Sequence, residues 1–227
     1  MTPYYSDDLV TLYHGDCRTI GAWLEADALV TDPPYGRAWK QGRLKNLNRV
    51  TQQENHHAGI AGDVDTGARD AALAQWGERA AVVFGDLMLP PPSNTRQVLV
   101  YRKPPDAGVR GATAGVRRDI EAIYLIGAWP SGLGGRSSVI ATAAPIQGSQ
   151  HGVPGRNGHP HAKPQDVMQT LVSLTGGTVA DPFAGSGSTL VAAKQLGRRA
   201  VGVEIEERYC EVAAKRLAQD TLFGGAA

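Results

Sequence analysis

The chain has 227 residues, a length that fits one compact domain, and its 23 Lys and Arg residues nearly balance its 22 Asp and Glu residues. The resulting net charge of +1 excludes the overall basicity that would by itself indicate nucleic-acid binding. Cys17 and Cys210 lie far apart in the sequence, which excludes a disulfide framework and fits a reduced protein. The N-terminus does not have the pattern of a signal peptide, and there is no apolar run of membrane-spanning length. We therefore expect a single cytoplasmic domain over residues 1–227.

Short apolar strands alternate with helical segments, which predicts an α/β fold with a doubly wound, mostly parallel sheet. The predicted strands cover residues 9–14, 28–31, 81–84, 97–101, 122–126, 178–181 and 199–205, with a further candidate at 139–142. The predicted helices cover residues 68–79, 164–175, 187–196 and 207–219. Pro164 is tolerated in the first turn of its helix, and Gly176 and Gly177 end it.

A glycine-rich turn follows the strand at 178–181. The segment Asp181-Pro-Phe-Ala-Gly-Ser-Gly-Ser-Thr189 places two glycines where a strand turns into a helix, so the backbone can approach a ligand closely. Glu204 ends the next strand, where an acid can accept hydrogen bonds from both hydroxyls of a ribose. The turn has neither the Gly-Lys-Ser/Thr ending of a phosphate-binding loop nor a third glycine. A nucleoside with little phosphate fits it best, and a purely structural turn is the alternative.

The tetrapeptide Asp32-Pro33-Pro34-Tyr35 follows the strand at 28–31, at the edge where open α/β sheets bind their ligands. The prolines fix the backbone and have no N–H, so the local carbonyls remain free to accept hydrogen bonds. Asp32 and the Pro33 carbonyl can then accept from one exocyclic amino group, while Tyr35 stacks on a planar ring. Two acceptors draw the nitrogen lone pair out of conjugation and direct it at an electrophilic methyl group. A rigid turn without a chemical role is the alternative.

The segments DPFAGSGST and VGVEIEERY resemble the cofactor-binding segments of S-adenosylmethionine (SAM)-dependent methyltransferases, and the tetrapeptide resembles that of the DNA amino-methyltransferases. Because the tetrapeptide precedes the glycine turn, the order resembles the permuted β group of that family. The segments His159-Pro-His-Ala-Lys163-Pro164 and Gly15-Asp16-Cys17 also resemble segments of this group that surround the cofactor. The resemblance implies a Rossmann-like, seven-stranded methyltransferase fold with permuted motif order. It implies SAM binding by Asp16, His159, Lys163, Pro164, Asp181, Phe183, Gly185, Gly187, Ser188, Thr189 and Glu204.

The resemblance implies methyl transfer from SAM to the N6 of adenine in DNA, with Asp32, Pro33, Pro34 and Tyr35 as catalytic residues. Asp at position 32 favours adenine by family resemblance only. Cytosine N4 is the first alternative, and an RNA amino-methyltransferase and a non-catalytic SAM- and DNA-binding protein also remain open. The target base leaves the duplex stack to reach the site. The implied partner is double-stranded DNA, and a homodimer and a restriction endonuclease partner are left open.

Five cations without an acid follow the tetrapeptide. Arg37, Lys40, Arg43, Lys45 and Arg49, together with Trp39, predict a mobile DNA-contacting loop over residues 37–60, because cations that touch phosphates position a duplex. A solvated loop is the alternative. We interpret residues 85–160 as containing small target-recognition insertions. The histidines have no zinc-ligand spacing, so we expect no metal site.

Overall fold

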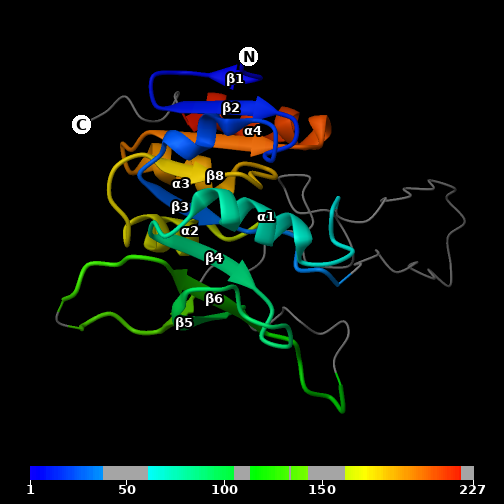
Figure 1. Cartoon of the computed structure of the whole chain (residues 1–227), viewed down its shortest axis with the longest axis vertical. Helices are drawn as coiled ribbons and strands as arrows, with labels where there is room; N and C mark the ends of the chain where they lie inside the picture. The colour runs from blue at the N-terminus through cyan, green and yellow to red at the C-terminus, as the bar shows by residue number, and fades with distance from the viewer. Residues whose placement is uncertain (38–60, 105–112, 133, 143–161, 221–227) are drawn as a thin grey trace, which may run out of the picture.

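The structure is a computed structural model that describes residues 1–37, 61–104, 113–132, 134–142 and 162–220. Its elements are, in chain order, β1 (Tyr5–Ser6), β2 (Val10–His14), η1 (Gly21–Glu25), β3 (Ala28–Thr31), α1 (Gly67–Trp76), β4 (Ala81–Gly85), β5 (Thr95–Arg102), β6 (Ile120–Ile126), β7 (Val139–Ala141), α2 (Gln165–Val172), β8 (Val179–Asp181), α3 (Ser188–Gln195), β9 (Ala200–Glu204) and α4 (Glu207–Asp220). Figure 1 shows how they are arranged. Among the described residues, no helix has both the length and the apolar character needed to cross a bilayer.

The described strands form one nine-stranded sheet in the order β1-β2-β9-β8-β3-β4-β6-β5-β7. The strands β2, β9, β8, β3 and β4 are consecutive and parallel, so they all end at the same edge of the sheet. Strand β6 is antiparallel to β4, and β5 is antiparallel to β6. The first residues of β6 and the last residues of β5 therefore also lie at this edge, which we call the carboxyl edge.

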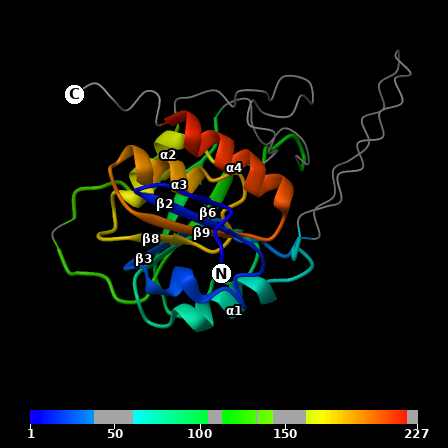
Figure 2. The same cartoon turned by 90° about the horizontal axis from the view of Figure 1, so that it is seen from above.

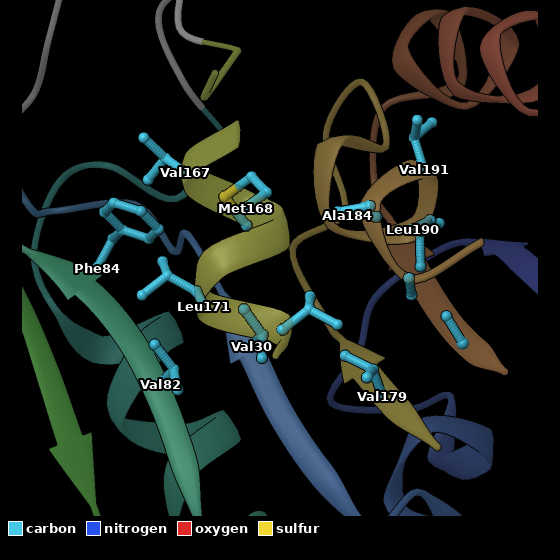
Figure 3. Close-up of a cluster of buried hydrophobic side chains, with 14 of the residues drawn as sticks. Val30, Val82, Phe84, Val167, Met168, Leu171, Val179, Ala184, Leu190 and Val191 are labelled. Carbon is cyan, nitrogen blue, oxygen red and sulfur yellow. The ribbon is translucent and has the colours of Figure 1, made fainter. Parts of the chain in front are cut away.

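Helices cover both faces of the sheet, as expected for a doubly wound fold (Figure 2). On one face, α2, α3 and α4 pack on alternate strand residues such as Val30, Val82 and Phe84. Figure 3 shows Met168 and Leu171 of α2 in this cluster of buried side chains. On the other face, η1 and α1 pack on the intervening strand residues, and the rings of Trp23 and Trp76 stack with their centroids 5.9 Å apart. Burial of both faces explains why the central strands are continuously apolar.

The predicted strands and helices are all present, with ends shifted by a few residues. Two short edge strands, the two-residue β1 and the three-residue β7, extend the seven central strands of the expected sheet. Neither β1 nor the 3₁₀ helix η1 was predicted from the sequence. A two-residue strand is too short to show an alternating pattern, and η1 is fixed by tertiary contacts of Trp23, whose indole N–H donates to the Cys17 carbonyl at 3.0 Å.

Candidate active site

The tetrapeptide and the glycine turn meet at the carboxyl edge because β3 and β8 are neighbouring parallel strands. Asp32 follows β3, and Asp181 is the last residue of β8. The Thr31 hydroxyl donates to Asp181 Oδ1 at 2.6 Å, which joins the two strand ends directly. Segments that are about 150 positions apart in the sequence, and that were predicted to act together, therefore lie side by side.

Within the tetrapeptide, the Tyr35 hydroxyl lies next to the Asp32 carboxylate. It donates to Asp32 Oδ1 at 2.9 Å, and the Glu121 Oε2 atom lies 3.2 Å from the same hydroxyl. Pro33 is buried, which anchors the turn, whereas 26% of the Asp32 side-chain surface is exposed to solvent. The acid of the tetrapeptide is thus held in place and still accessible.

Lys163 joins this group from the segment that leads into α2. Its ammonium lies 3.1 Å from Asp32 Oδ2 and 2.8 Å from Glu121 Oε2, and its side chain is only 10% exposed. It also lies 4.7 Å from the centre of the Phe84 ring, in the range of a cation–π contact. A second ammonium, that of Lys103, lies 2.7 Å from Glu121 Oε1. We call Asp32, Tyr35, Lys103, Glu121 and Lys163 the charged cluster.

The charged cluster shifts the titration of its members. Burial raises the pKa of Asp32, and nearby Glu121 also raises it, although Lys163 opposes both effects. Burial alone would raise the pKa of Glu121 too, but Lys163 and Lys103 outweigh it and lower that pKa to about 2. The two carboxylates raise the pKa of Lys163, so its ammonium stays charged. Asp32 consequently has a higher proton affinity than an ordinary aspartate, next to a fixed positive charge.

The glycine turn has the backbone form that a close ligand approach requires. Gly185 and Gly187 have φ angles of 51° and 81°, in the left-handed region that favours glycine. A Cβ on Gly187 would lie 3.0 Å from the Ala213 Cβ, so α4 packs directly against the turn. Phe183 is partly buried against the core cluster under η1 and α1, and its amide donates to Asp181 Oδ1 at 3.1 Å.

The hydroxyls of Ser188 and Thr189 are directed into the protein. Both residues are buried, and Arg216 of α4 lies 3.3 Å from the Ser188 hydroxyl while Thr189 hydrogen-bonds to Asp181. Burial raises the pKa of Asp181 to about 7, against the opposing hydrogen bonds from Thr189, Thr31 and the Phe183 amide. The two hydroxyls therefore support the turn in this structure.

Glu204 and Asp16 lie at the ends of the neighbouring strands β9 and β2, where His14 pairs with Glu204. One Glu204 oxygen accepts from the Gly185 amide at 2.7 Å, and the other accepts from the Glu206 amide at 2.7 Å. Each oxygen keeps a second lone pair, so the carboxylate can still accept from a pair of ligand hydroxyls. Burial raises the pKa of Glu204. The Asp16 carboxylate is paired with Arg18, whose hydrogen bonds lower the pKa of Asp16.

Six predicted site residues lie outside the residues that the structure describes: His159, Trp39, Lys40, Arg43, Lys45 and Arg49. Arg37 is described, and its guanidinium forms an ion pair with Asp86. Pro164 precedes α2 as its N-cap, and its carbonyl accepts the first helical hydrogen bond, from the Met168 amide at 3.1 Å. Among the described residues, no group of three or more His, Cys, Asp or Glu side chains is arranged to hold a metal ion.

Two residues near the tetrapeptide, Glu121 and Asp63, were not predicted from the sequence. Glu121 lies on β6, and no local motif surrounds it, so only the antiparallel sheet order could have placed it at the carboxyl edge. Lys103, which directly follows β5, faces Glu121 with its ammonium. Asp63 is buried and accepts hydrogen bonds from the amides of Gly36 and Arg37 at 2.7 and 3.3 Å. It thereby fixes the backbone that follows Tyr35.

Residues 118–215 of the chain match a family model described as DNA methylase, of the adenine-N6/cytosine-N4 type. The match covers β6, Lys163, the glycine turn and Glu204, whereas Asp16, the Asp32–Tyr35 tetrapeptide and Lys103 precede it in the chain. The chain is thus related to the adenine-N6 and cytosine-N4 amino-methyltransferases. The predicted resemblance to this type is confirmed.

Two curated relatives show how far the sequence similarity extends along the chain. The type II methyltransferase M2.DpnII of Streptococcus pneumoniae is 42% identical over 62 residues, which are 26% of this chain and 23% of that protein. This match therefore spans about a quarter of the relative's length. The putative methylase YubD of Escherichia coli (strain K12) is 29% identical over 226 residues, or 90% of this chain and 88% of that protein.

The solved structures confirm the predicted fold. The crystal structure of M1.HpyAVI superposes with a TM-score of 0.61 and 20% identity, covering 92% of this chain and 98% of that chain. The chain has the Rossmann-like α/β fold found in SAM-dependent methyltransferases. Its tetrapeptide precedes its glycine turn in the sequence, which is the permuted order that the motifs indicated.

Proposed function

We propose that the chain is a DNA methyltransferase that transfers a methyl group from SAM to the exocyclic N6 of adenine. The observation that carries this proposal is the position of the Asp32–Tyr35 tetrapeptide next to the glycine turn at one edge of the sheet. The family match, which is described as DNA methylase, supports DNA as the substrate and SAM as the cofactor.

The residues at the glycine turn fit SAM. The left-handed φ angles of the two glycines allow the sharp turn that brings the backbone to the carboxyl edge, and Glu204 offers two oxygens with free lone pairs for the ribose hydroxyls. We assign Gly185, Gly187 and Phe183 to cofactor contacts at the turn. In the same proposal Asp16 lies on the adenine side, and Asp181, Lys163 and Pro164 lie on the methionine side. When bound, SAM supplies an electrophilic methyl group on a sulfonium.

The tetrapeptide residues would act on the amino group of the base. The Asp32 carboxylate and the Pro33 carbonyl accept its two hydrogens, and the Tyr35 ring stacks on the base, an interaction worth about 1–3 kcal/mol. As the nitrogen forms its new bond it must lose a proton, and the raised pKa of Asp32 makes its carboxylate a competent acceptor. Burial raises the pKa of Cys17 to about 11 and that of Cys210 to about 12, which disfavours a thiolate nucleophile and supports direct transfer.

Cytosine N4 is the second candidate target, because the matched family covers both amino groups and the same acceptors suit either base. Asp32 favours adenine by resemblance alone. We also propose a homodimer and a restriction endonuclease as partners of the chain.

The test is to incubate the purified chain with methyl-labelled SAM and unmethylated genomic DNA, digest the DNA to nucleosides, and identify the labelled product by mass. We expect N6-methyladenine, and a loss of about 100- to 1000-fold in rate for Asp32→Asn, which keeps the shape but removes the charge. Asp8→Asn, which makes the same replacement at an exposed aspartate, is the matched control and should leave the rate unchanged. Label in N4-methylcytosine would correct the base. SAM binding without label in any DNA would refute the enzyme proposal.

A further inference from the structure

The hydroxyl of Tyr35 lies between two carboxylates. Its oxygen is 2.9 Å from Asp32 Oδ1 and 3.2 Å from Glu121 Oε2, while the Lys163 ammonium donates to it at 3.1 Å. A phenol has a single proton and cannot donate a full hydrogen bond to both acceptors. The contact with Asp32 is the shorter one, so Tyr35 occupies one oxygen of the acid in this structure.

This contact competes with the proposed reaction, on which the present inference rests. The target amino group needs the Asp32 carboxylate as its acceptor, and Oδ2 of that carboxylate already lies 3.1 Å from Lys163. If the Tyr35 hydroxyl stayed on Oδ1, each oxygen would already accept one hydrogen bond from the protein, which lowers the electron density that its remaining lone pair offers to the amine. An acceptor that takes over the Tyr35 proton would free Oδ1.

Glu121 has the position and the charge for this task. It is held from two sides, by Lys103 at Oε1 at 2.7 Å and by Lys163 at Oε2 at 2.8 Å, and its side chain is only 15% exposed. Tyr35 needs only a small displacement to shorten its existing contact with Oε2. The cluster contains two carboxylates and two ammonium groups, so the exchange of one hydrogen bond leaves its net charge unchanged.

We propose that Glu121 is a positioning residue that accepts the Tyr35 hydroxyl when the target amine binds, and thereby frees Asp32 to accept from that amine. Glu121 acts through Tyr35 and does not itself touch the base. No bond other than hydrogen bonds is made or broken in this exchange, and the Tyr35 proton stays on its oxygen throughout.

The test is a double-mutant cycle of Glu121→Gln and Tyr35→Phe, read as the rate of methyl transfer at saturating SAM and DNA. In the wild-type background, Glu121→Gln should lower kcat by about tenfold, because the amide is a weaker acceptor and the hydroxyl stays on Asp32. In the Tyr35→Phe background there is no hydroxyl to take over, so the same substitution should lower kcat by less than about twofold. The SAM Kd should stay within about twofold in all four proteins.

Glu25→Gln is the matched control, because Glu25 is an exposed carboxylate on η1, and it should not change kcat.

An equal loss from Glu121→Gln in both backgrounds would overturn the inference, since it would mean that Glu121 acts only through Lys163 or on stability. If Glu121→Gln does not fold, Lys103→Gln replaces it in the cycle, because this substitution loosens Glu121 but keeps its carboxylate. Lys103→Gln should then lower kcat in the wild-type background and have little effect in the Tyr35→Phe background. A wild-type chain that methylates no DNA would refute the proposed function and this inference together, whereas an active wild type without coupling would refute this inference alone.

Discussion

Two pairs of carboxylates lie along the carboxyl edge, one buried and one partly buried, and the protein holds them differently. Asp181 and Glu204, at the glycine turn, accept hydrogen bonds from hydroxyls and backbone amides, and among the described residues no lysine or arginine pairs with either of them. Asp32 and Glu121, in the charged cluster, are paired with lysines.

The consequence is a difference in proton affinity. Burial acts on all four acids, and without a cation it raises the pKa of Asp181 to about 7 and also raises that of Glu204. The two lysines reverse the effect for Glu121, whose pKa falls to about 2. Hydrogen bonds from neutral groups thus hold a carboxylate in position without keeping it ionised. A nearby ammonium both holds the carboxylate in position and keeps it ionised. Substitutions in the charged cluster test this difference most directly, and we expect them to have the largest effect.

Lys163→Met removes the ammonium that Asp32 and Glu121 share. Leaving buried charges unpaired costs about 3–5 kcal/mol in comparable pairs, so we expect a loss of that size in the free energy of unfolding, measured with urea at pH 8. Lys215→Met is the matched control, because Lys215 forms an exposed ion pair with Glu211 on α4 and should cost less than about 1 kcal/mol.

The double variant Lys163→Met with Glu121→Gln sharpens this expectation. Removing one of the orphaned carboxylates should restore part of the stability lost in the single variant, a non-additivity expected for groups in contact. Costs that simply add would contradict the interpretation that the loss comes from unpaired charge.

At the glycine turn, Glu204→Gln should act on ligand binding more than on stability. One oxygen of the carboxylate becomes an NH₂ group, which faces a backbone N–H donor and can no longer accept a ribose hydroxyl. We expect the SAM Kd, measured by calorimetry, to rise about tenfold or more, equivalent to roughly 1.4 kcal/mol per tenfold.

Glu206→Gln is the matched control for this variant. The Glu206 side chain pairs with Arg208, and only its backbone amide reaches Glu204, so the Kd should change less than about twofold. Equal SAM affinities for the Glu204→Gln variant and the wild type would show that the acid of β9 does not hold the cofactor.

The glycine turn was predictable from sequence because its geometry is local. A strand, two glycines, a helix and a second strand ending in Glu204 follow one another within residues 179–204, so spacing alone fixes which side chains reach the carboxyl edge. The tetrapeptide was recognisable for the same reason. Its position next to Asp181 followed from the expected parallel sheet.

The charged cluster was only half predictable. Lys163 lies in a recognisable segment, but its contact with Glu121 depends on the antiparallel order of β4, β6 and β5, which brings Glu121 opposite Tyr101 at the end of β5. This pairing joins residues from separate segments without any local signature. Lys103 directly follows β5, and only the pairing of β5 with β6 places its ammonium beside Glu121. Long-range pairing, rather than composition, decides these positions.

The smallest expected effect concerns Asp181, whose charge the fold leaves to pH. Its pKa is about 7 in the folded protein and about 3.9 in an unfolded chain, so the folded state binds the proton more tightly between these values. The stability that this contributes is fully present below about pH 4 and is lost as the pH rises through 7. Asp181→Asn, which imitates the protonated acid, should therefore gain about 1–2 kcal/mol relative to the wild type between pH 6 and pH 8, without SAM.

The measurement is thermal unfolding of both proteins at the two pH values, where about 1 kcal/mol corresponds to roughly 2–4 °C at this chain length. Asp119→Asn, which alters an ion pair with Arg117 far from the turn, should show no comparable dependence on pH. Because Thr31 and the Phe183 amide donate to the same oxygen, the asparagine oxygen can keep both hydrogen bonds, and the Thr189 hydroxyl can accept from the asparagine NH₂ group as it would from a protonated acid. A stability difference that stays constant from pH 6 to pH 8 would mean that Asp181 is already ionised in the folded protein, and that hydroxyls and amides alone can hold a buried carboxylate in its charged form.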